Sequence, residues 1–145
     1  MKIAIASDHG GFEQKEPLRA HLLERGYEVV DFGPETSERV DYPDYAASVA
    51  RAVAAGDVAY GILLCGTGIG MAIAANKVDG IRAANVTTPE FAALAREHND
   101  ANIITLSGRF VDLATNKTIV DTFLSTDFGG GRHAARVEAI MQLEH

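Results

Sequence analysis

The chain has 145 residues, 47% of them hydrophobic, a formal net charge of −7 and an isoelectric point of about 5.1. This length suits one domain with a substantial apolar core, and the acidic balance excludes a general electrostatic attraction to nucleic acid or to an anionic membrane. The single cysteine excludes an internal disulfide, and no apolar run is long enough for a signal sequence or a membrane span. We therefore expect a single cytoplasmic domain over residues 1–145, with no nucleic-acid or membrane partner. The final Leu-Glu-His resembles the remnant of an expression tag.

Short apolar runs alternate with helical patterns along the whole chain. In chain order, the sequence predicts a strand at 3–6, a helix at about 12–25, a strand at 28–33, a helix at about 43–55, a strand at 58–65, a short helix at 71–77, a strand at 81–86, a helix at 89–99, a strand at 102–107, a helix at about 112–124 and a last helix near the C-terminus. Pro17 lies inside the first helical pattern, which predicts either a loose first turn or a helix start near this residue. Strands that alternate with helices predict the α/β class. We expect a three-layer α/β/α sandwich around a five-stranded, parallel, Rossmann-like sheet, with a C-terminal helix.

Functional side chains of such a fold are expected at the carboxyl ends of the strands. The first strand is followed by Ser7-Asp8-His9, the third by the segment that begins at Cys65, and the fifth by Gly108-Arg109. We also expect His98-Asn99-Asp100 to lie at the same edge of the sheet as Asp8 and His9. Each histidine has a structural interpretation as well, as a turn residue beside an N-cap aspartate or as a cation at a helix C-terminus.

The sequence Cys-Gly-Thr-Gly-Ile-Gly at 65–70 joins an apolar strand to a glycine-rich turn. A dinucleotide-binding G-x-G-x-x-G does not fit, because Met71 or Ile73 occupies the third glycine position, and the Gly-Lys-Ser/Thr of a Walker A loop is absent. Free amides at such a turn favour a bound or developing anion and the thiolate of a neighbouring cysteine. The alternative is that Cys65 is a small buried hydrophobe beside a tight turn. Its position at the end of a strand favours the functional interpretation.

Arg132 and Arg136 follow three consecutive glycines and are four residues apart, so a helix places them on one face. Val137, Ile140 and Met141 form a separate apolar face. Two guanidinium groups at a helix start suit a phosphate, and a solvated charged face explains them equally well. The chain has no histidine pair at metal-ligand spacing and no HExxH motif, so we expect neither a metal nor another cofactor.

These motifs together resemble the ribose-5-phosphate isomerase B family, which is related to galactose-6-phosphate and allose-6-phosphate isomerases. The resemblance covers essentially the whole chain, and the combination of CGTGIG, HND and GGRH is its most specific part. The matching segments are 7–12, 41–43, 65–70, 74–77, 98–100 and 130–133.

The resemblance implies metal-free aldose–ketose isomerisation of a phosphorylated sugar through a cis-enediolate. Cys65 would be the base, because Met71 occupies the position at which one branch of the family has an acidic base, and a thioether cannot take a proton. His98 and Thr67 would move the proton that opens a cyclic sugar. The implied binding residues are Gly66, Gly68 and Gly70 at the enediolate, Asp8 at the sugar hydroxyls, Asn99 on the substrate, Tyr42 in the pocket wall, and His9, Arg109, Arg132 and Arg136 at the phosphate.

The favoured reaction is the conversion of ribose 5-phosphate to ribulose 5-phosphate. Galactose 6-phosphate or allose 6-phosphate isomerisation is an alternative, and a non-catalytic domain that binds a nucleotide or a sugar phosphate is an alternative of another class. The resemblance also implies a homodimer or a tetramer with sites shared between subunits. It leaves open which subunit supplies His98 and the arginines.

Overall fold

The computed structural model describes all 145 residues and contains five strands and six helices. The elements in chain order are β1 (Lys2–Ser7), α1 (Phe12–Glu24), β2 (Glu28–Asp31), α2 (Tyr42–Ala54), β3 (Tyr60–Cys65), α3 (Ile69–Ala75), β4 (Ala83–Asn85), α4 (Pro89–Asn99), β5 (Ile103–Ser107), α5 (Leu113–Ser125) and α6 (Arg132–Met141). Every predicted element is present, and only the ends differ from the prediction. α1 runs from Phe12 through Pro17, so the alternative of a helix start near the proline is wrong. None of the helices combines the length and the apolar composition that crossing a bilayer requires.

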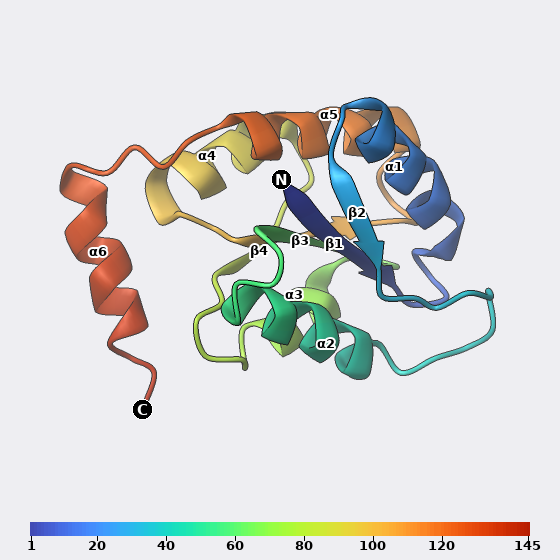
Figure 1. Cartoon of the computed structure of the whole chain (residues 1–145), viewed down its shortest axis with the longest axis horizontal. Helices are drawn as coiled ribbons and strands as arrows, with labels where there is room; N and C mark the ends of the chain where they lie inside the picture. The colour runs from blue at the N-terminus through green and yellow to red at the C-terminus, as the bar shows by residue number, and fades with distance from the viewer.

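All neighbouring strands of the sheet are parallel, in the order β2-β1-β3-β5-β4. β3 lies in the middle of the sheet and is buried over most of its length, as its apolar sequence predicts. Helices cover both faces: α1, α4 and α5 lie on one face, and α2 and α3 on the other (Figure 1). This arrangement confirms the predicted three-layer α/β/α sandwich.

The two faces of the sheet carry different cores, because side chains alternate along each strand. On β1, Ile3 and Ile5 pack into the core beneath α1, α4 and α5, which also holds Phe123. Ala4 faces the opposite way, toward α2 and α3. The second face is lined with smaller residues, so α2 packs close to the sheet: a β-carbon at Gly61 would lie 2.6 Å from Cγ1 of Val49. Each large buried side chain contributes about 1.5–3 kcal/mol to stability.

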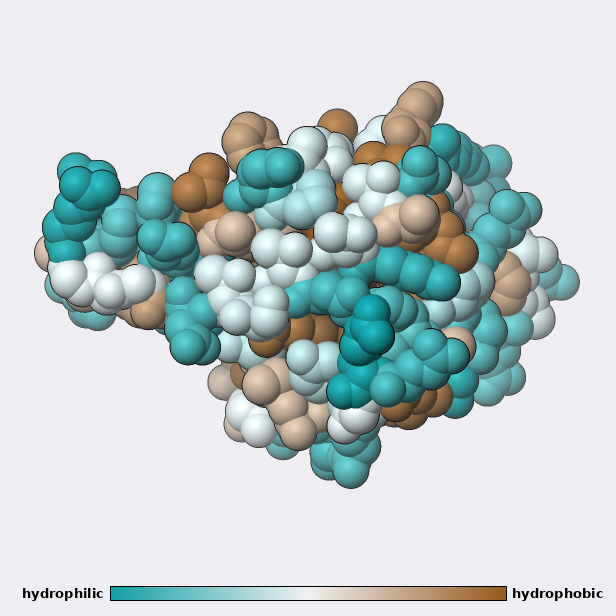
Figure 2. All heavy atoms as spheres, turned by 90° about the horizontal axis from the view of Figure 1, so that it is seen from above, coloured by the Kyte–Doolittle hydropathy of each residue, from teal (hydrophilic) through white to brown (hydrophobic).

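The C-terminal helix α6 stands apart from the sandwich (Figure 1). Among its residues only Val137 is buried, and Ile140 is 43% exposed. Seen from above, the end of the molecule that carries α6 forms a narrow lobe that projects beyond the body (Figure 2). The apolar face predicted for this helix is therefore only partly covered within one chain, because Val137 is buried and Ile140 is not.

Candidate active site

Cys65 is the last residue of β3, and its sulfur lies at the start of α3. The side chain is only 6% exposed, and Sγ accepts a hydrogen bond from the amide of Gly68 at 3.0 Å. Gly68 has a left-handed backbone with φ of +84°, which a residue with a β-carbon adopts only with strain. The glycine at this position therefore shapes the turn that points an amide at the sulfur. The amide of Gly68 is therefore directed at the sulfur of Cys65.

Neighbouring strands hold the loop that follows Cys65. Ser107 donates through Oγ to the carbonyl of Gly66 at 2.7 Å, and Asn85 donates through Nδ2 to the carbonyl of Thr67 at 3.1 Å. The amides of Gly66, Thr67 and Gly70 have no acceptor within the chain. The carbonyls of the loop are thus anchored, while several amides remain able to bind an oxyanion.

Two predicted site residues flank this loop. A β-carbon at Gly70 would lie 2.6 Å from Cε1 of Tyr42, so the tyrosine ring packs directly on the loop. A β-carbon at Gly66 would lie 3.3 Å from Cδ of Arg109. The structure therefore places Tyr42 and Arg109 beside the glycine loop.

Asp8 and His9 follow β1 and border the same loop. Asp8 accepts through Oδ1 from the amides of Gly10 at 2.7 Å and Gly11 at 3.1 Å, which leaves Oδ2 without a partner in these contacts. A β-carbon at Gly10 would lie 2.8 Å from the amide nitrogen of Gly66, so the two loops touch. Nδ1 of His9 is buried and has no hydrogen-bond partner. An unpaired buried nitrogen of this kind is suited to receive a ligand atom.

A cavity of about 500 Å³ opens beside these residues. Asp8, His9 and Tyr42 line it, together with Arg39 from the loop before α2. Arg39 is exposed and was not among the predicted site residues. Its only signal in the sequence is its place in a polar loop just before the predicted Asp41-Tyr42-Pro43 segment.

His98 and Asn99 do not lie at this edge of the sheet, so the expectation that they share an edge with Asp8 and His9 is wrong for a single chain. They end α4 just before β5 begins, whereas Cys65 ends β3. A helix that links parallel strands runs back along the sheet, so its last turn lies at the amino ends of the strands. Consistent with this, the carbonyl of Asn102, three residues after Asn99, accepts a hydrogen bond from the amide of Gly61 near the start of β3 at 3.1 Å.

A second group of predicted residues gathers around His98 at that opposite edge. The ring of His98 stacks on His133 at the start of α6, with centroids 4.3 Å apart and planes 15° from parallel. Partial burial and then the positive charges of His98, Arg132 and Arg136 lower the pKa of His133, against an opposing effect of Glu97. No hydrogen bond or ion pair within the chain involves the guanidinium of Arg132 or Arg136. Cationic groups therefore gather at this edge of the sheet, and the N–H donors of two guanidinium groups have no acceptor within the chain.

The structure brings the predicted residues together as two half-sites. The first contains the Cys65 loop with Asp8, His9, Tyr42 and Arg109, and the second contains His98 and its cationic neighbours. His133 was not predicted to act, although it is part of the GGRH motif. No three His, Cys, Asp or Glu side chains are arranged to hold a metal ion; the expectation of a metal-free reaction stays a prediction.

Known proteins resemble this chain over nearly its whole length. The model of the Ribose/Galactose Isomerase family matches residues 3–140. Ribose-5-phosphate isomerase B of Escherichia coli is 53% identical over 143 residues, which cover 99% of this chain and 96% of the relative. The structure of ribose-5-phosphate isomerase B from Clostridium thermocellum has 53% identity and a TM-score of 0.98, with 99% of this chain and 97% of that chain covered.

A third relative was solved with a sugar phosphate. It is ribose-5-phosphate isomerase B of Mycoplasma genitalium with bound ribulose-5-phosphate, 47% identical, with a TM-score of 0.95 and coverage of 99% of this chain and 95% of that chain. The family model covers most of the chain, and the solved relatives share its fold. The chain therefore belongs to the ribose/galactose isomerase family.

Proposed function

We propose that this protein interconverts ribose 5-phosphate and ribulose 5-phosphate through a cis-enediolate, without a metal. The observation that carries the proposal is the Cys65 sulfur, held 3.0 Å from the Gly68 amide beside amides that have no acceptor of their own. The names of the relatives support the reaction, and the bound ribulose-5-phosphate of one of them supports the substrate.

In this proposal Cys65 acts as the base. The thiolate removes a proton from the carbon beside the carbonyl, the electron pair forms the enediolate, and the same sulfur returns the proton to the neighbouring carbon. The free amides of Gly66, Thr67 and Gly70 stabilise the enediolate oxygens, and loss of one such donor typically costs about 100- to 1,000-fold in rate. Met71 is fully buried and offers no proton acceptor, so the thiol has no competing base at this position.

The remaining predicted residues take their proposed roles from the family. His98 and Thr67 move the proton that opens the furanose ring, and Asp8 bonds the sugar hydroxyls. Asn99 contacts the substrate and Tyr42 closes the pocket wall. The phosphate is bound by Arg132 and Arg136, with His9 and Arg109 as further contacts; charge-assisted hydrogen bonds of this kind are worth about 1.5–3 kcal/mol each.

We also propose a two-fold homodimer in which each active site combines the two half-sites from different subunits. Within one chain they lie at opposite edges of the sheet, so neither is complete. The projecting helix α6 carries Arg132 and Arg136 together with an apolar face that is partly exposed at Ile140. An isologous contact through α6 would cover that face and would form two complete sites at once.

The location proposed for this protein is the cytoplasm, and residues 1–145 are proposed to act as one domain. The single cysteine supports a cytoplasmic location. A catalytic Cys65 has to remain a reduced thiol, and the cytosol keeps thiols reduced.

A six-carbon sugar phosphate is the second candidate substrate, because the matching family model is described as Ribose/Galactose Isomerase.

Wild-type protein incubated in deuterium oxide with each sugar phosphate and a chelator tests the proposal. We expect deuterium at C1 or C2 of the pentose phosphates and a higher kcat/KM for ribose 5-phosphate than for allose 6-phosphate or galactose 6-phosphate. Binding without any exchange would instead support a non-catalytic domain.

A further inference from the structure

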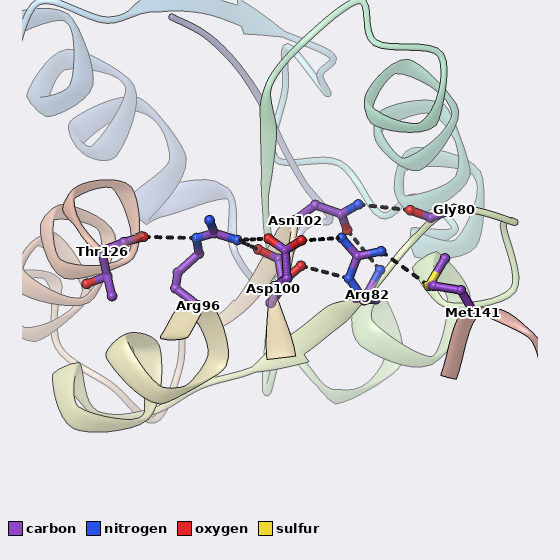
Figure 3. Close-up of polar contacts among 8 residues, drawn as sticks. Gly80, Arg82, Arg96, Asp100, Asn102, Thr126 and Met141 are labelled. Atoms are coloured by element: carbon purple, nitrogen blue, oxygen red, sulfur yellow. Dashed lines mark hydrogen bonds and ion pairs between the residues drawn. The ribbon is translucent and has the colours of Figure 1, made fainter. Parts of the chain in front are cut away.

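Three charged side chains meet at the end of α4, directly after His98 and Asn99 (Figure 3). Asp100 ends the helix in a left-handed conformation, with φ of +48°. Its Oδ1 accepts from Nη1 of Arg96 at 2.8 Å, and its Oδ2 accepts from Nη2 of Arg82 at 3.3 Å. Nε of Arg82 also donates to the carbonyl of Asp100 at 2.8 Å. Two arginines therefore hold this one residue at three oxygen atoms.

Both arginines are fixed to other parts of the molecule. Arg96 is only 4% exposed, donates through Nε to the carbonyl of Thr126 at 3.1 Å, and lies 4.9 Å above the ring of Tyr60. Arg82 precedes β4 and points Nη1 at Sδ of Met141 in α6, at 3.2 Å. Through these two arginines, Asp100 is connected both to the sandwich and to the projecting helix α6 (Figure 3).

The same turn is held from its other side. The amide of Gly129 donates to the carbonyl of Glu97 at 2.9 Å, and the ring of His98 stacks on His133. His98 and Asn99 therefore lie between two sets of fixed contacts. A simple helix C-cap needs neither two arginines nor a link to α6, so the network is larger than the end of a helix requires.

We propose that Asp100, clamped by Arg82 and Arg96, is a positioning residue that orients His98 for opening the sugar ring. This inference rests on the proposed function. Asp100 touches no reacting atom; it fixes the backbone that carries His98. A misplacement of about 1 Å can cost about 100-fold in rate, so loosening this turn impairs ring opening and leaves the proton transfer by Cys65 intact.

The chemistry of the two sugars separates the two steps. Ribose 5-phosphate is mainly a furanose and must open before deprotonation. Ribulose 5-phosphate cannot close to a furanose, because its C5 oxygen carries the phosphate. Exchange of its C1 hydrogen with solvent therefore reports proton transfer alone, whereas net conversion of ribose 5-phosphate also requires ring opening.

The test is Asp100→Asn, which keeps the size of the side chain and tolerates the left-handed backbone. We expect turnover of ribose 5-phosphate to fall roughly 10- to 100-fold, while deuterium uptake into C1 of ribulose 5-phosphate stays within about threefold of wild type. Arg82→Lys, which cannot make the same forked contacts, is the second variant and should give the same selective loss; it decides the question if Asp100→Asn does not fold.

The matched control is Asp121→Asn. Asp121 is 35% exposed against 34% for Asp100, and it also bridges two basic side chains, His21 and Arg25, far along the chain from the site. We expect this control to leave both rates unchanged. Equal loss of both rates in Asp100→Asn, or no loss of either, would overturn the positioning role. A wild-type protein that takes up no deuterium would overturn the proposed function and this inference with it.

Discussion

The reactivity proposed for Cys65 depends on the backbone of a single neighbouring residue. The Gly68 amide reaches the sulfur because Gly68 adopts φ of +84°, and Asn85 and the Leu106 carbonyl pack against its α-carbon. The sequence predicted that Cys65 adjoins a glycine turn, since glycines at alternate positions permit such geometry. It could not predict which amide meets the sulfur, because that depends on packing from β4 and β5. The same limit explains why Arg39, on a long polar loop, was missed.

Gly68→Ala tests this dependence. A β-carbon would strain the left-handed backbone by about 1–2 kcal/mol and would lie 3.0 Å from the carbonyl of Leu106. We expect kcat to fall about 100-fold or more, as for loss of an oxyanion donor. Gly26→Ala is the matched control, because Gly26 has φ of +89° with no atom within 4 Å of a β-carbon. The control should lower the melting temperature and leave kcat unchanged; equal kcat values for both variants would refute the role of the turn.

His133 provides a test by pH. Partial burial lowers its pKa below the usual value of about 6.5, and the charges of His98, Arg132 and Arg136 lower it further. The unfolded chain therefore binds this proton more readily than the folded protein does. The resulting contribution to stability is complete above pH 6.5 and is lost as the pH falls toward the lower folded pKa. NMR titration should give a pKa below 6.5 for His133, and His133→Gln should remove this part of the acid destabilisation; a pKa above 6.5 would contradict the cationic environment.

At the scale of helices and strands, the sequence pattern predicted every element. Short apolar runs, helical periodicity and polar loops alternate clearly along this chain. The wrong expectation was the edge of the sheet at which His98 lies. His98 precedes β5 rather than following a strand, and the last turn of α4 lies at the amino edge of the sheet. Spacing also could not reveal that Arg82, 18 residues before Asp100, holds the end of that helix.

Helix α6 is expected to bind the phosphate through Arg132 and Arg136. Arg132→Gln or Arg136→Gln removes one charge-assisted contact worth about 1.5–3 kcal/mol, so KM for ribose 5-phosphate should rise about 10- to 100-fold. Steady-state kinetics on both variants measures this rise. Arg25→Gln changes an exposed arginine that pairs with Asp121 instead and should leave KM unchanged. An unaltered KM in both α6 variants would show that the phosphate binds elsewhere.

For the whole molecule, the sequence patterns specified the layered fold, whereas the proposed active site requires two chains. The Cys65 half-site and the His98 half-site lie at opposite edges of one sheet, and α6 stands apart from the sandwich (Figure 1). Its apolar face is partly exposed at Ile140. A single chain's periodicity carries no information on how two such chains meet. The proposed homodimer would bring the two half-sites together without any rearrangement of the fold.

Mixed dimers test the shared site. In a dimer of one Cys65→Ser subunit and one His98→Ala subunit, one site has both defects and the other has none. Random mixing of the two inactive variants should therefore restore about one quarter of wild-type activity, since half of the dimers are mixed and half of their sites are intact. Native mass spectrometry, which separates mixed from unmixed dimers by mass, confirms the exchange of subunits. If mixed dimers form without any recovery of activity, each site belongs to one chain.

The most direct test of the account is the turnover of Cys65→Ser. Serine keeps the shape of the side chain, but its hydroxyl does not ionise near neutral pH, so the proton-relaying base is lost. We expect kcat to fall about 100- to 10,000-fold, the range for removal of an acid–base group, while ribulose 5-phosphate still binds with nearly unchanged Kd in calorimetry. A serine variant with wild-type kcat would contradict the central role of the thiol.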